Sequence, residues 1–499
     1  MKIRTATGTL LSTGILLLNA CTVGPNYRVP EHALVNAPAA RGAFIEGADP
    51  ALSEAPLPPD WWRLYSNSRL DTLVEEALSA NTNLQMANAN LERSRALLRE
   101  AKTLRQPSVA VGGSVEYAQL AGQQYLQLFT PPRNTYYETE LTVGYDLDLF
   151  GRIRRGIEAA KADDEAVEAA RDLVRVNVAA ETARAYAGAC GLGLQLESAK
   201  KSLALQRQSL ELTKELLQRG RAIDLDVTRS QQLVDQLTTS IPGLEAGRRN
   251  ALYRLATLTG RLPSQFDADL EDCATPPRIT EPLPVGDGAA LLKRRPDIRE
   301  TERQLAAATA EIGVATAQLY PDIQLGIGAG SIGARPDAFT SSTNFWQVGS
   351  ILTWQANQSA ARARIAAANA SAKLALAHFD GTVLTALADT ESALNTYVHD
   401  LQRESSAQAA RDDAATAERE AEALEVGGRA TSLTVIDGQR TLAAAEQSLA
   451  QLKSAISDDQ VAVFLALGGG WDSTPEAGGA PKLSVNFSTP CRGECNVQQ

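Results

Sequence analysis

The chain has 499 residues, 44% of them hydrophobic, few aromatic residues and a formal net charge of −11. This length exceeds one ordinary globular domain and fits two or three. The negative charge argues against a nucleic-acid partner, because binding to the phosphate backbone requires a basic surface. After the first twenty residues, no stretch approaches the roughly 20 apolar residues that a membrane-spanning helix needs. A membrane role would therefore depend on lipid, on β-strands, or on both.

Residues 1–20 are interpreted as a secretory signal peptide that is not part of the fold. Lys2 and Arg4 precede an apolar run, which ends in the sequence Leu-Asn-Ala-Cys at Cys21. A small residue directly before a cysteine is typical of a lipoprotein signal, so we expect cleavage before Cys21 and lipid, palmitate included, on that residue. An ordinary signal peptide with a chance cysteine is the alternative. An Asp directly after the cysteine would favour retention in the inner membrane, but Thr22 occupies this position and favours the outer membrane. We therefore expect residues 21–66 to form a lipidated, Pro-rich segment there.

Four further cysteines are Cys190, Cys273, Cys491 and Cys495. In an oxidising periplasm, Cys491 and Cys495 could form a small disulfide loop in the periplasmic tail, residues 471–499. Metal binding is the weaker interpretation, because the chain has three histidines and none lies near this pair. The sequence therefore predicts neither a metal site nor a cofactor.

A long internal repeat organises the mature chain. Residues 220–231 align without gaps on residues 428–439, and six of the twelve positions are identical. The repeat length of about 210 residues is far greater than that of a solenoid repeat, which indicates a duplicated domain. We place the first repeat at 67–283 and the second at 284–470.

Each repeat is predicted to contain a helix, two strands, a very long helix, a turn and another helix. The predicted helices after the strands are about 152–218 and 226–259 in the first repeat, and about 357–426 and 433–467 in the second. Leucines at exact spacings of seven, from Leu196 to Leu217, predict coiled-coil packing. A helix over 152–218 would be roughly 100 Å long at 1.5 Å per residue. This is far longer than a globular domain needs and suggests that the helix bridges a large distance.

The predicted strands are about 107–119, 136–150, 321–332 and 345–355. From Tyr137 to Leu149 the apolar residues occupy odd positions, and Glu138, Glu140 and Asp146 are among the even ones. This alternation is typical of a membrane β-barrel with a wet lumen. Two soluble hairpins packed on a helical body are the alternative. Four strands cannot close a barrel, and an open edge in lipid leaves unpaired backbone groups, so we expect an oligomeric barrel.

The sequence resembles the outer membrane factor family, the TolC-like efflux channels, in its nodulation-protein-T-type lipoprotein branch. The resemblance covers nearly all of the mature chain and is specific because six segments occur in the right order. These segments are 21–27 with Pro30, Trp61-Trp62, 146–152, 291–298, 312–315 with Tyr320-Pro321, and 467–471.

This resemblance implies an α+β membrane protein that acts as a homotrimer. Its strands would form a 12-stranded outer-membrane β-barrel in contact with lipid, above a periplasmic α-barrel of long coiled-coil helices that is closed at the far tip. The implied partners are a periplasmic adaptor protein and an inner-membrane resistance–nodulation–division transporter. The channel would conduct drugs or other small molecules passively, and it would not be an enzyme.

The resemblance also implies where the channel is gated. The tip would lie at the two helix–helix turns, near Gly220 and Gly428, and a leucine and an aspartate after the second turn point into the pore in related channels. Counting from Gly428 assigns these roles to Leu433 and Asp437. Three leucines can form a constriction that dewets, and three carboxylates favour cations. The alternative is that Leu433 belongs to a coiled-coil core and Asp437 is a solvated surface charge.

The sequence adds charge at the tip and departs from the family pattern there. Asp224 and Asp226 occupy the matching turn of the first repeat and are expected at the pore entrance. Leu424 and Glu425 replace an Arg-Tyr pair that bonds neighbouring helices in related proteins, so the usual lock of the tip is missing. The usual Gly-Gly after the fourth strand is also replaced, by residues 356–358.

Other functional interpretations have less support. The glycine pattern at 328–333 follows a predicted strand but opens no helix, which excludes a dinucleotide-binding loop. Arg152, Arg154 and Arg155 are predicted to be charges at the periplasmic rim. A channel for protein secretion with an ABC exporter remains open, as does a lipid-tethered coiled-coil scaffold. The lipid cysteine and residues 467–471 favour small-molecule efflux.

Overall fold

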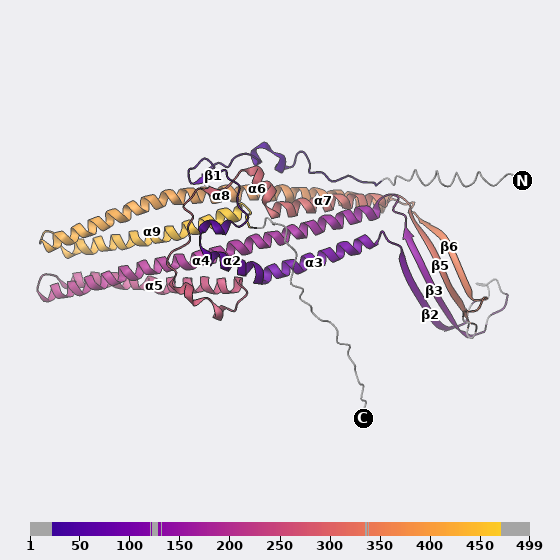
Figure 1. The fold of residues 1–499 in the computed structure, drawn as a ribbon, viewed down its shortest axis with the longest axis horizontal. Coiled ribbons are helices and arrows are strands. Elements are labelled where there is room, and N and C mark those ends of the chain that lie inside the picture. The colour runs from indigo at the N-terminus through magenta and orange to yellow at the C-terminus, as the bar shows by residue number, and fades with distance from the viewer. Residues whose placement is uncertain are drawn as a thin grey trace, which may run out of the picture.

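A long helical body carries a four-stranded sheet at one end and two helix hairpins at the other (Figure 1). The computed structural model describes residues 22–119, 121, 128–130, 132–334, 337 and 339–470. Cys21, Cys491 and Cys495 lie outside these residues, as do the signal peptide and the tail, so the lipid and the disulfide expected there remain predictions.

The two halves of the chain have the same order of elements. The first half contains α2 (Ser68–Ala80), α3 (Thr82–Thr103), β2 (Ser108–Ala118), β3 (Asn134–Asp146), α4 (Arg152–Gln218) and α5 (Asp224–Leu258). The second half contains α6 (Gly288–Arg294), α7 (Pro296–Ala317), β5 (Asp322–Ala334), β6 (Asn344–Thr353), α8 (Ser359–Val426) and α9 (Ser432–Ala466). Short strands β1 (Leu52–Ser53) and β4 (Leu283–Pro284) pair in parallel at the waist of the body.

Helices α4 and α8 give the body its length. They contain 67 and 68 residues and no proline, so their backbone hydrogen bonds continue without a break. At 1.5 Å per residue each helix is about 100 Å long. Among the described residues, none of the helices combines the length and the apolar character needed to cross a membrane.

The sheet has the strand order β2-β3-β5-β6 with antiparallel neighbours, so strands from the two halves meet at its centre. Its register places all the carboxylates of the strands on one face: Glu116, Glu138, Glu140, Asp146 and Asp322. The opposite face is apolar, and its side chains such as Val111 and Trp346 are about four-fifths exposed in the single chain. The sheet therefore has the predicted apolar face and the predicted acidic face.

Strand β3 ends four residues before the predicted limit of 150. The Asp148 carboxylate accepts hydrogen bonds from the backbone N–H groups of Ile153 and Arg154, both at 2.9 Å. It therefore satisfies the free N–H groups that begin α4. The residues between Asp146 and Arg152 form a turn into the helix rather than a continuation of the strand.

Residues at the start of the described chain clamp the junction between sheet and helices. Gly24 packs so closely on Gly313 of α7 that a Cβ would overlap the Gly313 backbone. Arg155 of α4 is 3% exposed and donates to the carbonyls of Val23 and Gly24 and to the Asn26 side chain. The prediction that Arg155 is a rim charge was wrong, because its guanidinium is buried against this segment.

The other two arginines of this group do not share that burial. Arg152 is exposed and pairs with Asp322 at 3.3 Å, whereas Arg154 binds Asp148 at 3.2 Å.

The waist of the body holds the largest core. Trp61 is fully buried and stacks on Phe464 of α9 with ring centroids 4.7 Å apart. Trp62 and Tyr65 pack beside it, and the cluster extends to α2, α4 and α5. This core joins the N-terminal segment to helices of both halves.

A disulfide joins Cys190 of α4 to Cys273 in the crossover between the two halves. The crossover is held further by Gln460 of α9, whose amide bonds both the N–H and the carbonyl of Ile279. Ser457 also donates to the Pro277 carbonyl at 2.6 Å. The sequence did not indicate this pairing, because the two cysteines are 83 residues apart.

Replacing both cysteines, Cys190→Ser with Cys273→Ser, should lower the free energy of unfolding by roughly 4 kcal/mol, because the reduced chain regains the entropy of a long loop. Thermal unfolding in detergent, followed by circular dichroism, measures the loss as a lower Tm. A reducing agent should lower the Tm of the wild type toward that of the variant and leave the variant unchanged. An unchanged Tm in the variant would contradict a stabilising role.

Candidate functional site

The two hairpin turns have the same backbone geometry. Gly220 and Gly428 have φ values of 69° and 68°, a left-handed conformation that favours glycine. The N–H of each glycine bonds the carbonyl three residues earlier, at 2.9 Å, and the next N–H bonds the carbonyl five residues earlier, at 2.8 Å. This is the Schellman pattern that ends a helix. The turns lie side by side at the end of the body opposite the sheet (Figure 1).

Leu433 and Asp437 lie in the first turns of α9, four residues apart and thus on one face of the helix. Leu433 is 44% exposed and Asp437 is also exposed, whereas Val435 and Ile436 between them are buried. Within the single chain Leu433 is therefore not a core residue. The two side chains are available to a lumen or to another subunit.

Asp224 and Asp226 begin α5 after the first turn. The Asp226 carboxylate accepts a hydrogen bond from the Ile223 N–H at 3.2 Å, so it caps the helix. Asp224 is exposed. Both residues lie directly after the first hairpin turn, and Asp226 has a local structural role.

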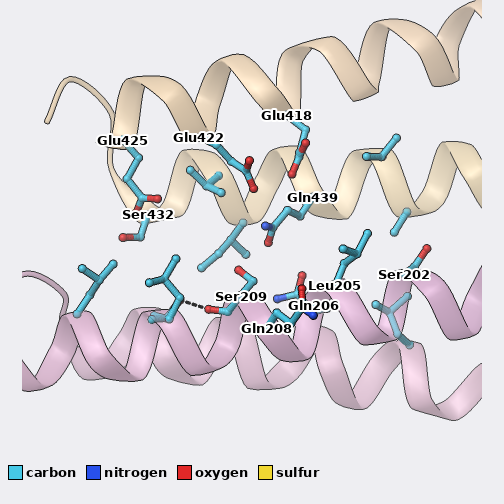
Figure 2. Close-up of a pocket in the computed structure, with 18 of the residues that line it drawn as sticks. Ser202, Leu205, Gln206, Gln208, Ser209, Glu418, Glu422, Glu425, Ser432 and Gln439 are labelled. Carbon is cyan, nitrogen blue, oxygen red and sulfur yellow. Dashed lines mark hydrogen bonds between the residues drawn. The ribbon is translucent and has the colours of Figure 1, made fainter. Parts of the chain in front are cut away.

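A groove of about 360 Å³ separates the two hairpins just above the turns. Figure 2 shows its two walls, with carboxylates of α8 on one side and uncharged polar side chains of α4 on the other. Glu418, Glu422 and Glu425 line the first wall, and Gln206 and Ser209 belong to the second. Sequence reasoning missed this groove. The spacing of the glutamates indicates a shared helix face but does not identify the helix opposite.

The carboxylates of the groove influence one another. Burial raises the pKa of Glu418, and a hydrogen bond with Glu422 raises it further. Two carboxyl groups can share such a bond only when one of them holds a proton.

Leu424 and Glu425, the residues expected to replace an Arg-Tyr pair, lie at the C-terminal end of α8. Glu425 lines the groove, whereas Leu424 is partly exposed and Val426 is 85% exposed. Neither of the residues that replace the lock can donate a side-chain hydrogen bond when Glu425 is ionised.

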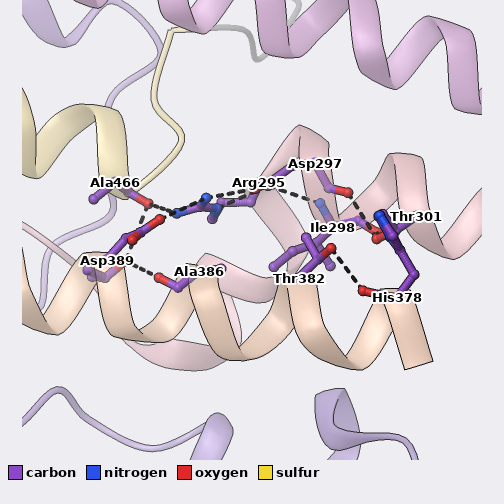
Figure 3. Close-up of polar contacts among 10 residues, drawn as sticks. Arg295, Asp297, Ile298, Thr301, His378, Thr382, Ala386, Asp389 and Ala466 are labelled. Carbon is purple, nitrogen blue, oxygen red and sulfur yellow. Dashed lines mark hydrogen bonds and ion pairs between the residues drawn. The ribbon is translucent and has the colours of Figure 1, made fainter. Parts of the chain in front are cut away.

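The C-terminal end of α9 is held by two arginines at the junction of α6 and α7. Arg295 is nearly buried, donates to the Ala466 carbonyl at 2.7 Å and forms a two-point ion pair with Asp297 (Figure 3). Arg294 donates to the Leu467 carbonyl at 2.8 Å. These contacts satisfy carbonyls at the C-terminal end of α9, which have no partner within the helix.

A second carboxyl pair lies between α8 and α9 above the groove. Burial raises the pKa of Asp459 to about 7, and the neighbouring Asp400 and Asp458 carboxylates add to the effect. One oxygen of Asp459 is buried without a hydrogen-bond partner. Asp400 is itself buried and accepts a hydrogen bond from Arg403 at 2.5 Å. When Asp459 is protonated, its carboxyl group can donate a hydrogen bond to Asp400.

No arrangement typical of metal or nucleotide binding was found in the described part of the chain. Residues 22–470, apart from the short gaps in the two outer loops, contain no group of His, Cys, Asp and Glu that could hold a metal ion. Residues 328–333 lie within β5, so this glycine pattern belongs to a strand.

Comparison with known proteins agrees with this architecture. The model of the outer membrane efflux protein family matches residues 73–261 and again residues 289–469. Nodulation protein T of Rhizobium leguminosarum bv. trifolii is 28% identical, over 93% of this chain and 97% of that protein. The pyoverdine export outer membrane protein OpmQ of Pseudomonas putida is 30% identical, over 85% of this chain and 91% of that protein.

Solved structures give the same result. The outer-membrane channel OprN superposes with a TM-score of 0.84 and 34% identity, over 90% of this chain and all of that chain. The outer membrane protein VceC of Vibrio cholerae superposes with a TM-score of 0.76 and 25% identity, over 83% of this chain. The chain therefore belongs to the outer membrane efflux protein family. It is an outer-membrane efflux channel whose helical body extends into the periplasm.

The Asp400–Asp459 pair predicts a pH-dependent stability. The pKa of Asp459 is raised in the folded state, so the folded protein binds more protons than the unfolded chain between about pH 4 and pH 7. Stability should therefore fall as pH rises through this window and level off above it. Asp459→Asn should remove this contribution, so its Tm relative to wild type should be higher at pH 8 than at pH 5.

Thermal unfolding of both proteins at the two pH values measures this difference. Asp413→Asn is the matched control, because Asp413 is an exposed aspartate of α8 more than three helical turns from Asp400. The control should not reproduce the gain at pH 8. An Asp459→Asn variant with the same Tm difference at both pH values would disprove the raised pKa of Asp459.

Proposed function

We propose that three copies of this chain form one closed channel that conducts drugs or other small molecules passively to the exterior. The sheet of the single chain carries the argument. Its outer strands β2 and β6 each have a neighbour on one side only, its apolar face is exposed, and its other face carries every carboxylate of the strands. Three such sheets joined edge to edge give twelve strands, with lipid outside and water inside.

The helices would follow the strands into the periplasm. Each chain contributes α3, α4, α7 and α8 next to the sheet, so three chains would form a twelve-helix barrel. The similar halves, and the two matches of the family model, support an origin by duplication. The hairpins α4–α5 and α8–α9 would then converge at the periplasmic tip.

Leu433 and Asp437 are proposed as the gate of this tip. Their exposure on one face of α9 supports the proposal, because a pore-lining side chain must be free of contacts within its own chain. A ring of three leucines would exclude water when closed, and a ring of three carboxylates would favour cations. Gly220, Asp224 and Gly428 would complete the entrance.

The channel would act within a tripartite pump. A periplasmic adaptor protein would bind the tip, and an inner-membrane resistance–nodulation–division transporter would supply the energy, so the channel itself would catalyse no reaction. Lipid on Cys21 would anchor each chain in the outer membrane. The names of the relatives refer to export of pyoverdine, cations, antibiotics and toluene, which supports small-molecule cargo rather than secreted protein.

Single-channel conductance in planar lipid bilayers tests the channel and its gate. The wild type should give small, cation-selective currents. The double variant Leu433→Ala/Asp437→Ala should give larger currents with less cation selectivity, because it removes both the constriction and the carboxylates. Leu384→Ala/Asp413→Ala is a matched control on α8, outside the tip, and should behave as wild type.

Two results would contradict the proposal. A folded protein that never inserts into the bilayer would exclude the barrel and favour a lipid-tethered scaffold. Channels of unchanged size and selectivity in the Leu433→Ala/Asp437→Ala variant would place the gate elsewhere.

A further inference from the structure

The two hairpins carry different charges at equivalent positions after their turns. The gap-free repeat pairs Leu225 with Leu433, five residues after Gly220 and Gly428, and pairs Arg229 with Asp437, nine residues after them. The two turns share the same hydrogen bonds and glycine conformation, so these residue pairs are equivalent in the structure as well as in the sequence. Both halves have a leucine at the first position. At the second position, one half has an arginine and the other an aspartate.

Both pairs lie on helix faces that the single chain leaves open. Helix α5 buries Ser230, Leu233 and Val234, while Leu225 is 49% exposed and Arg229 is partly exposed. Helix α9 shows the same division between buried and exposed residues. Residues four apart share a helix face, so Leu225 and Arg229 form one stripe, and Leu433 and Asp437 form the other.

Within the part of the chain that the structure describes, the charged members of these stripes form no ion pair. Among the described residues, no ion pair involves the side chain of Arg229 or of Asp437. Three Asp437 carboxylates brought together at a closed tip would also repel one another, since like charges in a confined site are unfavourable. A closed tip therefore needs compensating cations at this level.

We propose that Arg229 of one subunit pairs with Asp437 of the neighbouring subunit and that these pairs close the tip, an inference that rests on the proposed trimeric channel. Three arginines and three aspartates alternate around the tip, and Leu225 and Leu433 form an apolar belt next to them. The two-point geometry of a guanidinium suits a carboxylate partner. These contacts take the place of the Arg-Tyr lock, which Leu424 and Glu425 cannot supply.

The pairing has a consequence for selectivity. In the closed tip the arginines partly offset the charge of the aspartates, so the ring attracts cations less strongly. When the hairpins separate, the pairs break and the carboxylates face the lumen. Cation selectivity is therefore weaker in the closed tip than in the open one.

A charge-swap experiment in planar bilayers tests the pairing. Arg229→Asp and Asp437→Arg should each raise the resting conductance, because like charges then meet at the tip. The double variant Arg229→Asp/Asp437→Arg should return to the low conductance of the wild type. Arg249→Asp is the matched control, since Arg249 is an exposed arginine of the same helix, α5, about 30 Å beyond Arg229, and it should leave the conductance unchanged. The effects should shrink in 1 M salt, where charges are screened within about 3 Å.

The outcomes separate this inference from the proposed channel. A double variant as conductive as the single ones, or an Arg229→Asp variant identical to wild type, overturns the pairing while the channel stands. Absence of any current from inserted wild type and from Leu433→Ala/Asp437→Ala overturns the channel itself.

Cross-linking keeps the test valid if a charge-reversed variant fails to assemble. Arg229→Cys/Asp437→Cys, in a background without Cys491 and Cys495, should be joined between subunits by a short bis-maleimide reagent. The matched variant Arg249→Cys/Asp437→Cys should react less, because residue 249 is about 30 Å further along α5 than residue 229. Equal cross-linking of the two variants, or none in the first, overturns the pairing.

Discussion

The unpaired edges of strands β2 and β6 are the constraint on which the rest of the molecule depends. Backbone N–H and C=O groups have no partner in hydrocarbon, so a sheet in a bilayer must close on itself. One chain supplies four strands, an exposed apolar face and an acidic face, and it cannot close alone. The proposed closure with other copies would fix the spacing of the strands. Because β3 leads into α4 and β6 into α8, it would also fix the circle on which the long helices stand.

Local patterns in the sequence predicted the helices and strands well. The absence of proline and the heptads predicted a helix over 152–218, and α4 spans Arg152–Gln218. The alternation of polar and apolar residues predicted the faces of the sheet. These signals act between residues close in sequence, so they can be read without knowing the fold. The end of β3 was placed too late because Asp148, in an alternating stretch, turns its carboxylate to the next helix.

Contacts between distant segments were not predictable in the same way. Cys190 and Cys273 carry no spacing that indicates a bond, and the burial of Arg155 depends on a segment 130 residues earlier. The turns at Gly220 and Gly428 were visible as a repeat. The groove between the hairpins was not, because its walls are α4 on one side and the α8–α9 hairpin on the other, about 200 residues apart. The positions of Leu433 and Asp437 on an open helix face follow from helical geometry, but the gate proposed for them depends on copies that the sequence does not contain.

The clamp at the start of the described chain determines how the proposed anchor would act. Thr22 packs against Gly151, where the sheet passes into α4, and Arg155 holds the next residues in place. A lipid on the preceding residue would be only one Cα–Cα step, about 3.8 Å, from this fixed point. Such a short connection would leave the lipid little freedom to move relative to the sheet. The lipid would therefore set the depth of the strands in the membrane, whereas a long flexible linker would only keep the protein near the membrane surface.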